Sequence, residues 1–462
     1  MFFKLIKDIL TPSMLLVIVG LSSCKKMIEV APSPRLISSK AVFSNDKTVM
    51  SAVGDVYTSM LLATTLFSNN RMSFYCGLSA DEIYNTASNT DYDAYAQNTL
   101  VRDHPSIQSS IWRPAYVALY KINLILEGLA SSPNISAALN KQLTGEMKTL
   151  RAWYYFCLVN LFGDVPLILS SEYEVNAIMP RTASGKIYEQ IIVDLKDAKN
   201  LLRTDYPSVG KARPNKWTAT ALLSRVYLFQ EDWTNAALEA SEVITSGAYQ
   251  LVSDLNKVFL MNSEETLWEV PPPNGLLNTG IGGSYIPSSS TRVPTFAIRP
   301  SLLDAFEPND LRKSAWINKN TVAGKTYYYP FKYKYRTTAA PLSEYNTMIR
   351  FDELYLIRAE ARIHLEDLDG SRDDIDMIRL RASLSKTPAE SKEELLKAVY
   401  TERRLELFTE WGHRWLDLKR TGQADLVLNE EKGSQWQSTD GLYPIPYSEI
   451  LYNPFLTQNP GY

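Results

Sequence analysis

The chain has 462 residues, of which 45% are hydrophobic, and its formal net charge at pH 7 is -3. This length suffices for about two or three domain-sized units with a large buried core, and the near-neutral charge lacks the basic footprint of a nucleic-acid-binding protein. Aromatic side chains are abundant, with 27 Tyr and 9 Trp residues, and such rings offer flat apolar faces beside a polar group.

The N-terminal residues have the order of an export signal. Lys4 and Lys7 precede an apolar run over 14–21, which is shorter than the roughly 20 residues that a membrane-spanning helix needs. The sequence Leu21-Ser22-Ser23-Cys24 follows and resembles the bacterial lipobox, in which the cysteine is acylated before cleavage. We therefore predict a cleaved signal peptide over 1–23 and a membrane-anchoring lipid on Cys24. The alternative is a plain signal peptide that ends before a cysteine.

The remaining cysteines and the histidines show no metal-binding pattern. Cys157 lies in the apolar run 153–159, which is typical of a small buried hydrophobic residue, although a bridge to Cys76 is an alternative in an oxidising compartment. The three histidines are far apart and match no ligand spacing: His104, His364 and His413. We predict neither a metal site nor a cofactor.

Helical periodicity dominates the chain after a Pro-containing leader over 24–40, which we interpret as a flexible stalk. Apolar residues at three- and four-residue spacing predict helices over 47–67, 111–129, 141–161, 186–202, 215–230, 232–246, 351–366, 371–382 and 391–420. Several follow one another as pairs with small residues between them, which loosely resembles tetratricopeptide units. The predicted fold class is mostly α, a tetratricopeptide-like scaffold of helix pairs with long irregular loops and a few short strands.

Two stretches lack helical periodicity. Residues 68–110 are polar and aromatic, and residues 255–345 are rich in Pro, Gly, Ser and Tyr, which favours irregular backbone with a few short strands. We accordingly divide the mature chain into an N-terminal helical region over 41–254 and a C-terminal region over 255–462, the latter with a loop-rich insertion and the final helices.

Catalytic motifs are missing from the sequence. It contains no nucleophile elbow, phosphate-binding loop or zinc-protease helix, and the nearest candidates for a carboxylate pair are Asp81-Glu82 and Glu264-Glu265. Adjacent residues on a strand point to opposite faces, so neither doublet makes a facing pair. The charged stretch over 402–417 predicts ion pairs on the surface of an amphipathic helix, such as Glu410 with Arg414.

Several motifs along the mature chain resemble those of one family. Arg151-Ala152-Trp153-Tyr154-Tyr155-Phe156 and the following residues 161–167 are similar to a hallmark stretch of the SusD/RagB nutrient-uptake lipoproteins. The C-terminal helix of that family resembles residues 402–404 and 411–418, and its closing segment resembles 443–446, 453–454 and 458–462. Arg350-Phe351 leading into Ala359-Glu360 adds a further match.

This resemblance implies a role in nutrient capture at the outer membrane of Gram-negative bacteria, facing the exterior. A member of this family partners a SusC-type TonB-dependent transporter and acts as a non-catalytic lid that captures an oligosaccharide and delivers it to the barrel. In some members the ligand is a peptide, and that is our alternative. A surface glycoside hydrolase is a third hypothesis, which the lack of catalytic motifs in the sequence disfavours.

In this family, the aromatic side chains that contact the ligand come from irregular segments of the protein. In this chain those segments are 68–110 and 268–331. Sugar rings stack their apolar faces on aromatic side chains, while sugar hydroxyls need fixed polar partners. The residues predicted to stack are Tyr75, Tyr84, Tyr92, Tyr95, Tyr285 and Trp316, and those predicted to donate or accept hydrogen bonds are Arg71, Asp81, Asn98 and Arg292. For each ring the alternative is that it packs within its own loop. Trp153 and Trp411 are predicted to belong to the core.

Overall fold

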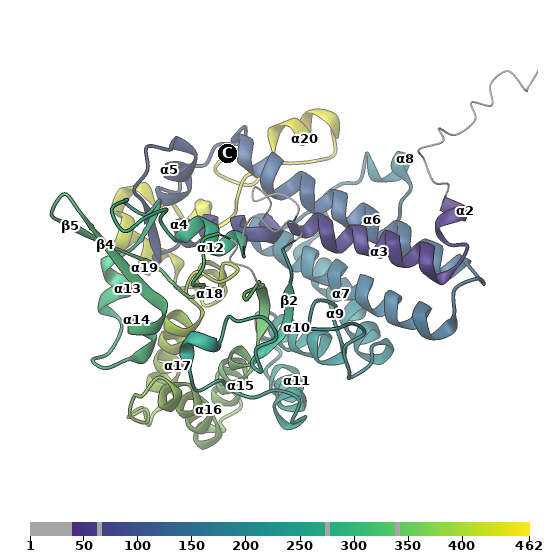
Figure 1. Cartoon of the computed structure of the whole chain (residues 1–462). Coiled ribbons are helices and arrows are strands. Elements are labelled where there is room, and N and C mark those ends of the chain that lie inside the picture. The colour runs from purple at the N-terminus through teal and green to yellow at the C-terminus, as the bar shows by residue number, and fades with distance from the viewer. Residues whose placement is uncertain (1–38, 62–66, 273–277, 338–341) are drawn as a thin grey trace, which may run out of the picture.

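The computed structural model describes residues 39–61, 67–272, 278–337 and 342–462 (Figure 1). The predicted signal peptide, Cys24 and most of the stalk lie outside these residues. None of the helices in the described part of the chain is both long and apolar enough to cross a bilayer.

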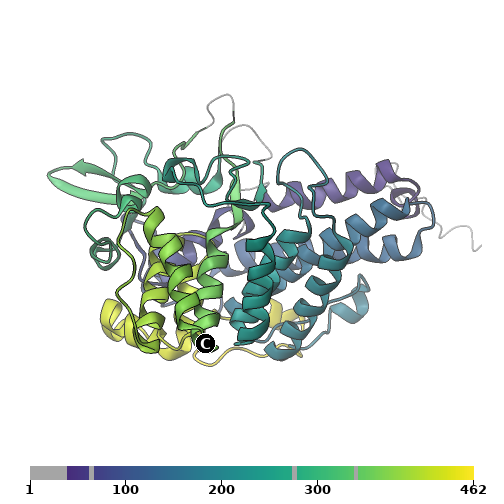
Figure 2. The same ribbon diagram turned by 90° about the horizontal axis from the view of Figure 1, so that it is seen from below.

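A row of antiparallel helices forms one side of the molecule (Figures 1 and 2). Most neighbouring helices in the row follow one another in sequence, which confirms the predicted scaffold of helix pairs, while α11 packs against α15 across the intervening loop-rich region. The row contains α2 (Ser39–Val42), α3 (Asp46–Leu61), α6 (Arg113–Ser131), α7 (Ala137–Phe162), α9 (Ser184–Leu201), α10 (Lys216–Phe229), α11 (Trp233–Thr245), α15 (Asp352–His364) and α16 (Leu368–Arg381).

Small and capping residues explain why these helices pair closely. Ala236 and Ala240 are fully buried between α10 and α11, and Ser224 Oγ donates a hydrogen bond to the Ala236 carbonyl across the interface at 2.9 Å. Asp232 caps the N-terminus of α11, and Asn215 forms a capping box at the start of α10. These local signals fix where each helix of the pair begins.

The core is centred on the aromatic stretch of α7. Trp153 is 2% exposed and lies 5.7 Å from Phe67, 6.1 Å from Trp268 and 5.9 Å from Trp411, measured between ring centroids. Trp411 is itself buried, so the prediction that both tryptophans belong to the core is confirmed. The same stretch of α7 contacts α9 through Arg151, whose Nε donates to Asp194 at 2.7 Å.

The two stretches predicted to be irregular contain short ordered elements. The few short strands predicted over 255–345 are confirmed, whereas the short helices in both stretches were not predicted. Residues 67–112 form the π-helix η2 (Phe67–Arg71), α4 (Met72–Ser79), β1 (Ile83–Asn85), α5 (Thr90–Ala96) and the π-helix η3 (Ile107–Trp112). Residues 255–350 form η4 (Leu255–Lys257), β2 (Thr266–Val270), α12 (Gly280–Tyr285), β3 (Phe296–Ile298), α13 (Pro300–Asp304), α14 (Leu311–Trp316), β4 (Ile317–Val322), β5 (Lys325–Pro330) and β6 (Asn346–Arg350). The strands pair as antiparallel ribbons β1–β3, β2–β6 and β4–β5.

The helix predicted over 391–420 is interrupted. It divides into α17 (Lys392–Leu407) and α18 (His413–Arg420), and Thr409, Trp411 and Gly412 between them have positive φ angles of 56°, 47° and 77°. Gly412 packs so closely that an added Cβ would lie 2.8 Å from Cβ of Cys76. The close approach of α4 therefore explains the break, after which the chain continues through α19 (Ala424–Lys432) and α20 (Tyr447–Tyr452).

Cys76 and Cys157 are both buried and both free. The alternative of a disulfide between them is therefore wrong, and the thiols act as small apolar side chains in the core. Burial raises the pKa of the Cys76 thiol to about 12, so this group stays protonated.

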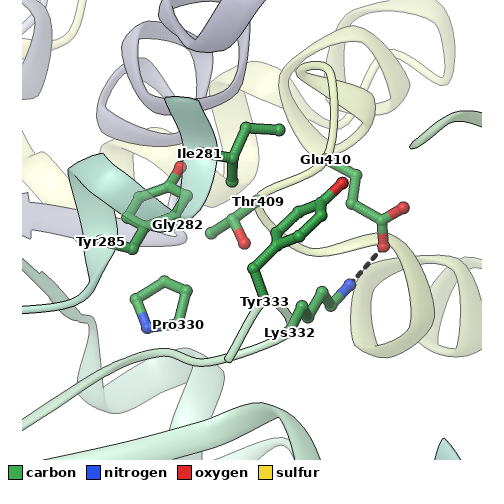
Figure 3. A pocket seen from close by; sticks show the side chains of 8 residues that line it. All are labelled: Ile281, Gly282, Tyr285, Pro330, Lys332, Tyr333, Thr409 and Glu410. Atoms are coloured by element: carbon green, nitrogen blue, oxygen red, sulfur yellow. Dashed lines mark hydrogen bonds and ion pairs between the residues drawn. The ribbon is translucent and has the colours of Figure 1, made fainter. Parts of the chain in front are cut away.

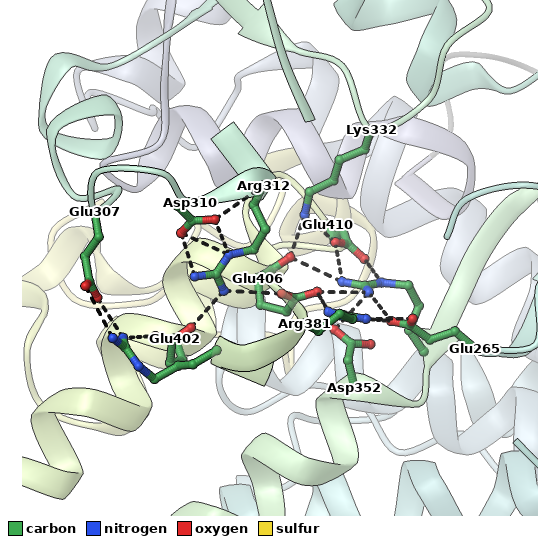
Figure 4. Close-up of polar contacts among 12 residues, drawn as sticks. Glu265, Glu307, Asp310, Arg312, Lys332, Asp352, Arg381, Glu402, Glu406 and Glu410 are labelled. Atoms are coloured by element: carbon green, nitrogen blue, oxygen red, sulfur yellow. Dashed lines mark hydrogen bonds and ion pairs between the residues drawn. The ribbon is translucent and has the colours of Figure 1, made fainter. Parts of the chain in front are cut away.

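The charged stretch over 402–417 is buried, so the predicted surface ion pairs are wrong (Figure 4). Glu402, Glu406 and Glu410 recur every four residues and project from α17 and the loop after it into the interior. Their partners are arginines from distant elements. Arg312 on α14 contacts Asp310, Glu402 and Glu406, and Arg350 on β6 contacts Glu265, Glu406 and Glu410. Arg381 on α16 contacts Glu265 and Glu406. We call these residues, with Lys332, Asp352 and Arg379, the buried ion network, and Glu307 extends it to the surface through Arg379.

The Glu406→Gln substitution should destabilise the fold severely. Glu406 is fully buried and contacts Arg312, Arg350 and Arg381, and removing one partner of a buried ion pair typically costs about 3–5 kcal/mol. Urea unfolding of the soluble chain that begins after Cys24 measures the loss. As a control, Glu366→Gln breaks the exposed pair with Lys392 and should leave the midpoint nearly unchanged. Equal effects of both substitutions would contradict the importance of the network.

Candidate functional site

The π-helix η2 leads into α4 and packs against α12, and Arg71 at its end contacts Tyr92 of α5. Figure 1 shows α4, α5 and α12 on the same side of the molecule. One extra residue in a helical turn redirects the side chains that follow, and π-helical turns are frequent at functional sites. Here the turn contains Asn69, Asn70 and Arg71. We call Asn70, Arg71, Tyr92 and Ser284 the α5–α12 surface.

Arg71 is held in place by aromatic rings and not by an acidic partner. Its guanidinium carbon lies 4.8 Å from the ring centroid of Phe74 and 5.5 Å from that of Tyr75, and Nη1 donates to the Tyr92 hydroxyl at 3.3 Å. Its Nε has no hydrogen-bond partner. A half-exposed cation that is fixed but only partly hydrogen-bonded can still donate to a ligand.

Asn70, the residue before Arg71 in the π-helix, is only 3% exposed and supports this surface from within. Its Nδ2 donates to the Gly280 carbonyl at 3.1 Å and to Ser284 Oγ at 2.8 Å, which joins η2 to α12, while the buried Oδ1 has no hydrogen-bond partner among the described residues. Tyr92 completes the arrangement as a half-buried ring, positioned because Asn89 caps α5 and accepts from the Tyr92 backbone nitrogen at 3.1 Å. A ring beside a partly exposed guanidinium suits a sugar or another polar ligand.

Tyr84 lies on a different surface. Side chains alternate along the β1–β3 ribbon, and Phe296, the partner of Asn85, contacts Tyr92 with ring centroids 5.0 Å apart. Tyr84 pairs with Ala297 and therefore points to the opposite face of the ribbon, where burial and the nearby Tyr327 of β5 raise its pKa. The structure thus separates Tyr84 from the α5–α12 surface.

The other four aromatic residues predicted to stack on sugar are core residues. Tyr75 stacks on Tyr95 with ring centroids 4.0 Å apart, and the indole nitrogen of Trp316 donates to the Leu255 carbonyl at 2.9 Å. Each has at most 3% of its surface exposed: Tyr75, Tyr95, Tyr285 and Trp316. A ring without an exposed face offers a sugar nothing to stack on. We therefore assign all four to packing and keep the stacking prediction for Tyr84 and Tyr92.

Two of the residues predicted to form ligand hydrogen bonds are also buried. Asp81 accepts from Arg414 Nε at 2.7 Å and pairs with Arg404; burial alone would raise its pKa, but these arginines lower it to about 2. Asn98 is 6% exposed and accepts from Lys432 Nζ. Both groups are engaged within the protein, so neither is free to bind a ligand. Arg292 is exposed; its backbone carbonyl accepts from Asn320 Nδ2 at 2.8 Å and its backbone nitrogen donates to the Ser289 carbonyl at 3.2 Å.

Glu82 is a neutral buried acid. Burial and the neighbouring Asp81 raise its pKa to about 8, and its Oε1 accepts from the Thr409 backbone nitrogen at 3.1 Å. Asp81 and Glu82 therefore face different partners, in agreement with the prediction that they form no facing carboxylate pair.

The Glu82→Gln variant should lose less stability than the parent chain as the pH rises. The pKa of Glu82 is raised on folding from the ordinary 4.5 to about 8, so its favourable contribution is complete below pH 4.5 and is lost as pH rises through 8. Gln keeps the acceptor for Thr409 and does not titrate. Unfolding midpoints of both chains between pH 5 and 9 measure the difference, and parallel curves would contradict the raised pKa.

A small cavity lies beneath α12 (Figure 3). Its volume is about 10 Å³, which is room for about one water molecule. Its lining residues are Ile281, Gly282, Tyr285, Pro330, Lys332, Tyr333, Thr409 and Glu410. The cavity is too small for a sugar ring, and Lys332 and Glu410 connect it to the buried ion network.

Three buried carboxylates have the spacing of metal ligands. Oxygens of Glu265, Asp352 and Glu406 lie within 4.8 Å of one another. However, Arg350 Nη1 lies 2.8 Å from both Glu265 and Asp352, and Arg381 Nη1 lies 2.7 Å from Glu265. Burial also raises the pKa of Asp352 well above its ordinary value, which favours the neutral acid. Guanidinium groups thus supply the positive charge here, and we interpret the cluster as part of the ion network.

Sequence reasoning missed Asn70 and Ser284. Asn69-Asn70-Arg71 precedes the apolar run 72–78, which is a usable signal for polar residues at the start of a helix. The π-helical turn that fixes their direction has no sequence signature, and Ser284 comes close only through the tertiary fold.

Comparison with known proteins identifies the family of this chain. The family described as "Starch-binding associating with outer membrane" matches residues 43–228, and the SusD family matches residues 307–462. The chain belongs to the SusD/RagB family. Among curated relatives of this SusD-like chain, a SusD-like protein of Formosa agariphila is 23% identical and aligns over 95% of both chains. The starch-binding protein SusD of Bacteroides thetaiotaomicron is 24% identical, over 78% of this chain and 82% of its own.

Solved structures share the whole architecture. A SusD superfamily protein from Bacteroides vulgatus superimposes with a TM-score of 0.81 at 22% identity, over 91% of this chain and 100% of its own. A laminarin-binding SusD-like protein superimposes with a TM-score of 0.75 at 24% identity, over 91% of this chain and 100% of its own. The chain therefore has the SusD-like fold.

Proposed function

We propose that this SusD-like chain is a non-catalytic lipoprotein of the outer membrane that captures oligosaccharides and delivers them, as a lid, to a SusC-type TonB-dependent transporter. The observation that carries the ligand class is the α5–α12 surface, where the half-buried Tyr92 ring lies beside the partly exposed guanidinium of Arg71, which forms no ion pair within the described residues.

The chemistry of this surface suits a sugar. The apolar C–H face of a pyranose ring packs on an aromatic ring, while its hydroxyls both donate and accept hydrogen bonds. Arg71 offers a donor, and its guanidinium is held by Phe74, Tyr75 and Tyr92 before a ligand arrives, so little rotamer freedom remains to be lost on binding. The names of the similar proteins, which describe binding to starch and laminarin, support the same ligand class.

The alternative is capture of an oligopeptide, for which Arg71 would bind a carboxylate. Arg71 has no acidic partner, which leaves its charge available for such a contact. A surface glycoside hydrolase receives no support from either carboxylate doublet, because Asp81, Glu82 and Glu265 are buried and engaged by the protein itself.

Binding of oligosaccharides should depend on Tyr92 and Arg71. In isothermal titration of the soluble chain against starch, laminarin and other plant, host and microbial oligosaccharides, Arg71→Met should weaken binding about 10- to 100-fold through loss of a charged hydrogen bond, and Tyr92→Ala up to about 10-fold. Tyr173→Ala is a matched control, because Tyr173 is 80% exposed and remote from this surface.

Other results of the same titration reject parts of the proposal. Binding to peptides alone would favour the peptide alternative, and release of reducing ends would favour a hydrolase. If Tyr84→Ala weakens binding while Tyr92→Ala does not, the ligand binds on the opposite face of the β1–β3 ribbon.

The lipid anchor should depend on Cys24. In the native bacterium, Cys24→Ala should abolish incorporation of labelled palmitate and move the chain out of the outer-membrane fraction, because two or more acyl chains are needed for stable anchoring. Retention of the variant in that fraction after a high-salt wash, without palmitate, would show that another part of the chain binds the membrane.

A further inference from the structure

A groove on the protein surface is lined jointly by α17, α18 and the start of α19. Its volume is about 690 Å³, which lies within the roughly 300–1,000 Å³ that is usual for small-molecule binding sites. The residues of the α5–α12 surface do not line it, so the two surfaces are separate. We call it the α17–α19 groove, and the lining residues that matter most for its chemistry are Lys397, Tyr400, Thr401, Arg404, Arg414 and Gln423.

Two guanidinium groups that line the groove share a single carboxylate. Arg414 donates to the two oxygens of Asp81 through Nε at 2.7 Å and Nη2 at 2.9 Å, and Arg404 Nη2 lies 2.7 Å from the second of these oxygens. Arg404 also donates from Nη2 to the Ser301 hydroxyl at 3.4 Å, while its buried Nε has no hydrogen-bond partner among the described residues. One negative charge therefore faces two positive charges at this point of the groove.

Other acidic residues nearby do not supply the missing negative charge. Glu82 is neutral at pH 7, because burial raises its pKa to about 8. Glu431 pairs with Arg299 at 2.9 Å. Asp417, which also lines the groove, is already bound by two arginines of its own at 2.8 and 2.7 Å. The excess positive charge beside Asp81 thus remains uncompensated within the described residues.

The protonation of Arg404 agrees with this shortage of negative charge. Burial lowers its pKa, the attraction of Asp81 opposes that effect, and repulsion from Arg414 lowers the pKa further. The side chains of Arg404 and Arg414 nevertheless stay 16% and 13% exposed. An anion in the groove would act as a second counter-ion, and hydrogen bonds between a partly buried guanidinium and an anion are strong.

The remainder of the groove suits a sugar ring. Tyr400 is half-buried, and burial raises its pKa to about 12, so its hydroxyl group stays protonated beside an apolar ring face. Thr401 and Gln423 are exposed and offer polar partners for sugar hydroxyls. The exposed Glu393 and Lys397 carry opposite charges, so together they leave the excess positive charge of the groove unchanged.

We propose that the α17–α19 groove is a second binding site, for an acidic sugar whose carboxylate pairs with Arg404 while its ring packs on Tyr400. A uronic acid has both the carboxylate and the apolar ring face, whereas a neutral hexose lacks the charge that the arginines leave unmatched. The site goes beyond the ligand surface at Tyr92 and does not depend on it.

Isothermal titration of the soluble chain with digalacturonate tests this site, with the neutral galactobiose and inorganic sulfate as comparison ligands. Digalacturonate should bind, and Arg404→Gln should weaken its binding about 10- to 100-fold through loss of a charged hydrogen bond. Asp81 keeps both of its bonds to Arg414 in that variant, so we expect the fold to be retained. Tyr400→Ala should weaken binding up to about 10-fold.

A second variant tests the groove without a change to its arginines. Thr401→Glu places a carboxylate in the groove, where it competes with the ligand for Arg404, and should abolish digalacturonate binding. The matched control is Asn429→Glu on α19, which adds the same charge at an exposed position outside the groove lining and should leave the affinity unchanged.

Four results would overturn the second site. They are no binding of digalacturonate, equally tight binding of galactobiose, equally tight binding of sulfate, and equal effects of Thr401→Glu and Asn429→Glu. Tyr92→Ala and Arg71→Met separate this site from the α5–α12 surface. Digalacturonate binding that survives both of these substitutions but not Thr401→Glu supports the groove, whereas the reverse pattern assigns the ligand to the α5–α12 surface and rejects the groove alone.

Discussion

The carboxylate of Glu406 lies in the interior of the protein among the guanidinium groups of Arg312, Arg350 and Arg381, and this ion network determines how the C-terminal part of the chain assembles. The three arginines come from α14, the β2–β6 ribbon and α16, so a single buried side chain on α17 links all of them. Each charge would be very costly to bury alone. The elements are therefore stable only in the arrangement that brings the charges together.

The same network supports the ligand surface through the loop between α17 and α18. Within this loop, the Thr409 backbone nitrogen donates to Glu82, and the Trp411 backbone nitrogen donates to Ser73 at 3.2 Å. Arg414 then pairs with Asp81. These contacts fix both ends of α4, on which the rings that hold Arg71 are placed. The buried charges that resembled a catalytic or surface feature in the sequence thus act as the support for a binding surface.

The sequence predicted the helix pairs well because their apolar faces are long and regular, and their starts carry capping residues such as Asn215. It failed where elements are short. Helices α4, α5 and α12 have 8, 7 and 6 residues, too few for a periodicity to be recognised. It also failed for Glu402, Glu406 and Glu410, since four-residue spacing places side chains on one helix face without revealing whether that face meets water or arginines. Burial of Tyr95 and Trp316 likewise depends on residues far away in sequence. The prediction that aromatic rings stack on sugar therefore remains only for Tyr84 and Tyr92.

The ligand binding that we propose for this SusD-like protein therefore depends on the α5–α12 surface, where a half-buried tyrosine ring lies beside a partly exposed guanidinium. A crystal structure of the soluble chain with its tightest-binding oligosaccharide tests the central claim most directly. We expect a sugar ring packed on Tyr92, with a hydroxyl group that accepts a hydrogen bond from the guanidinium of Arg71. A sugar bound elsewhere, with no contact to Tyr92 or Arg71, would contradict the proposal.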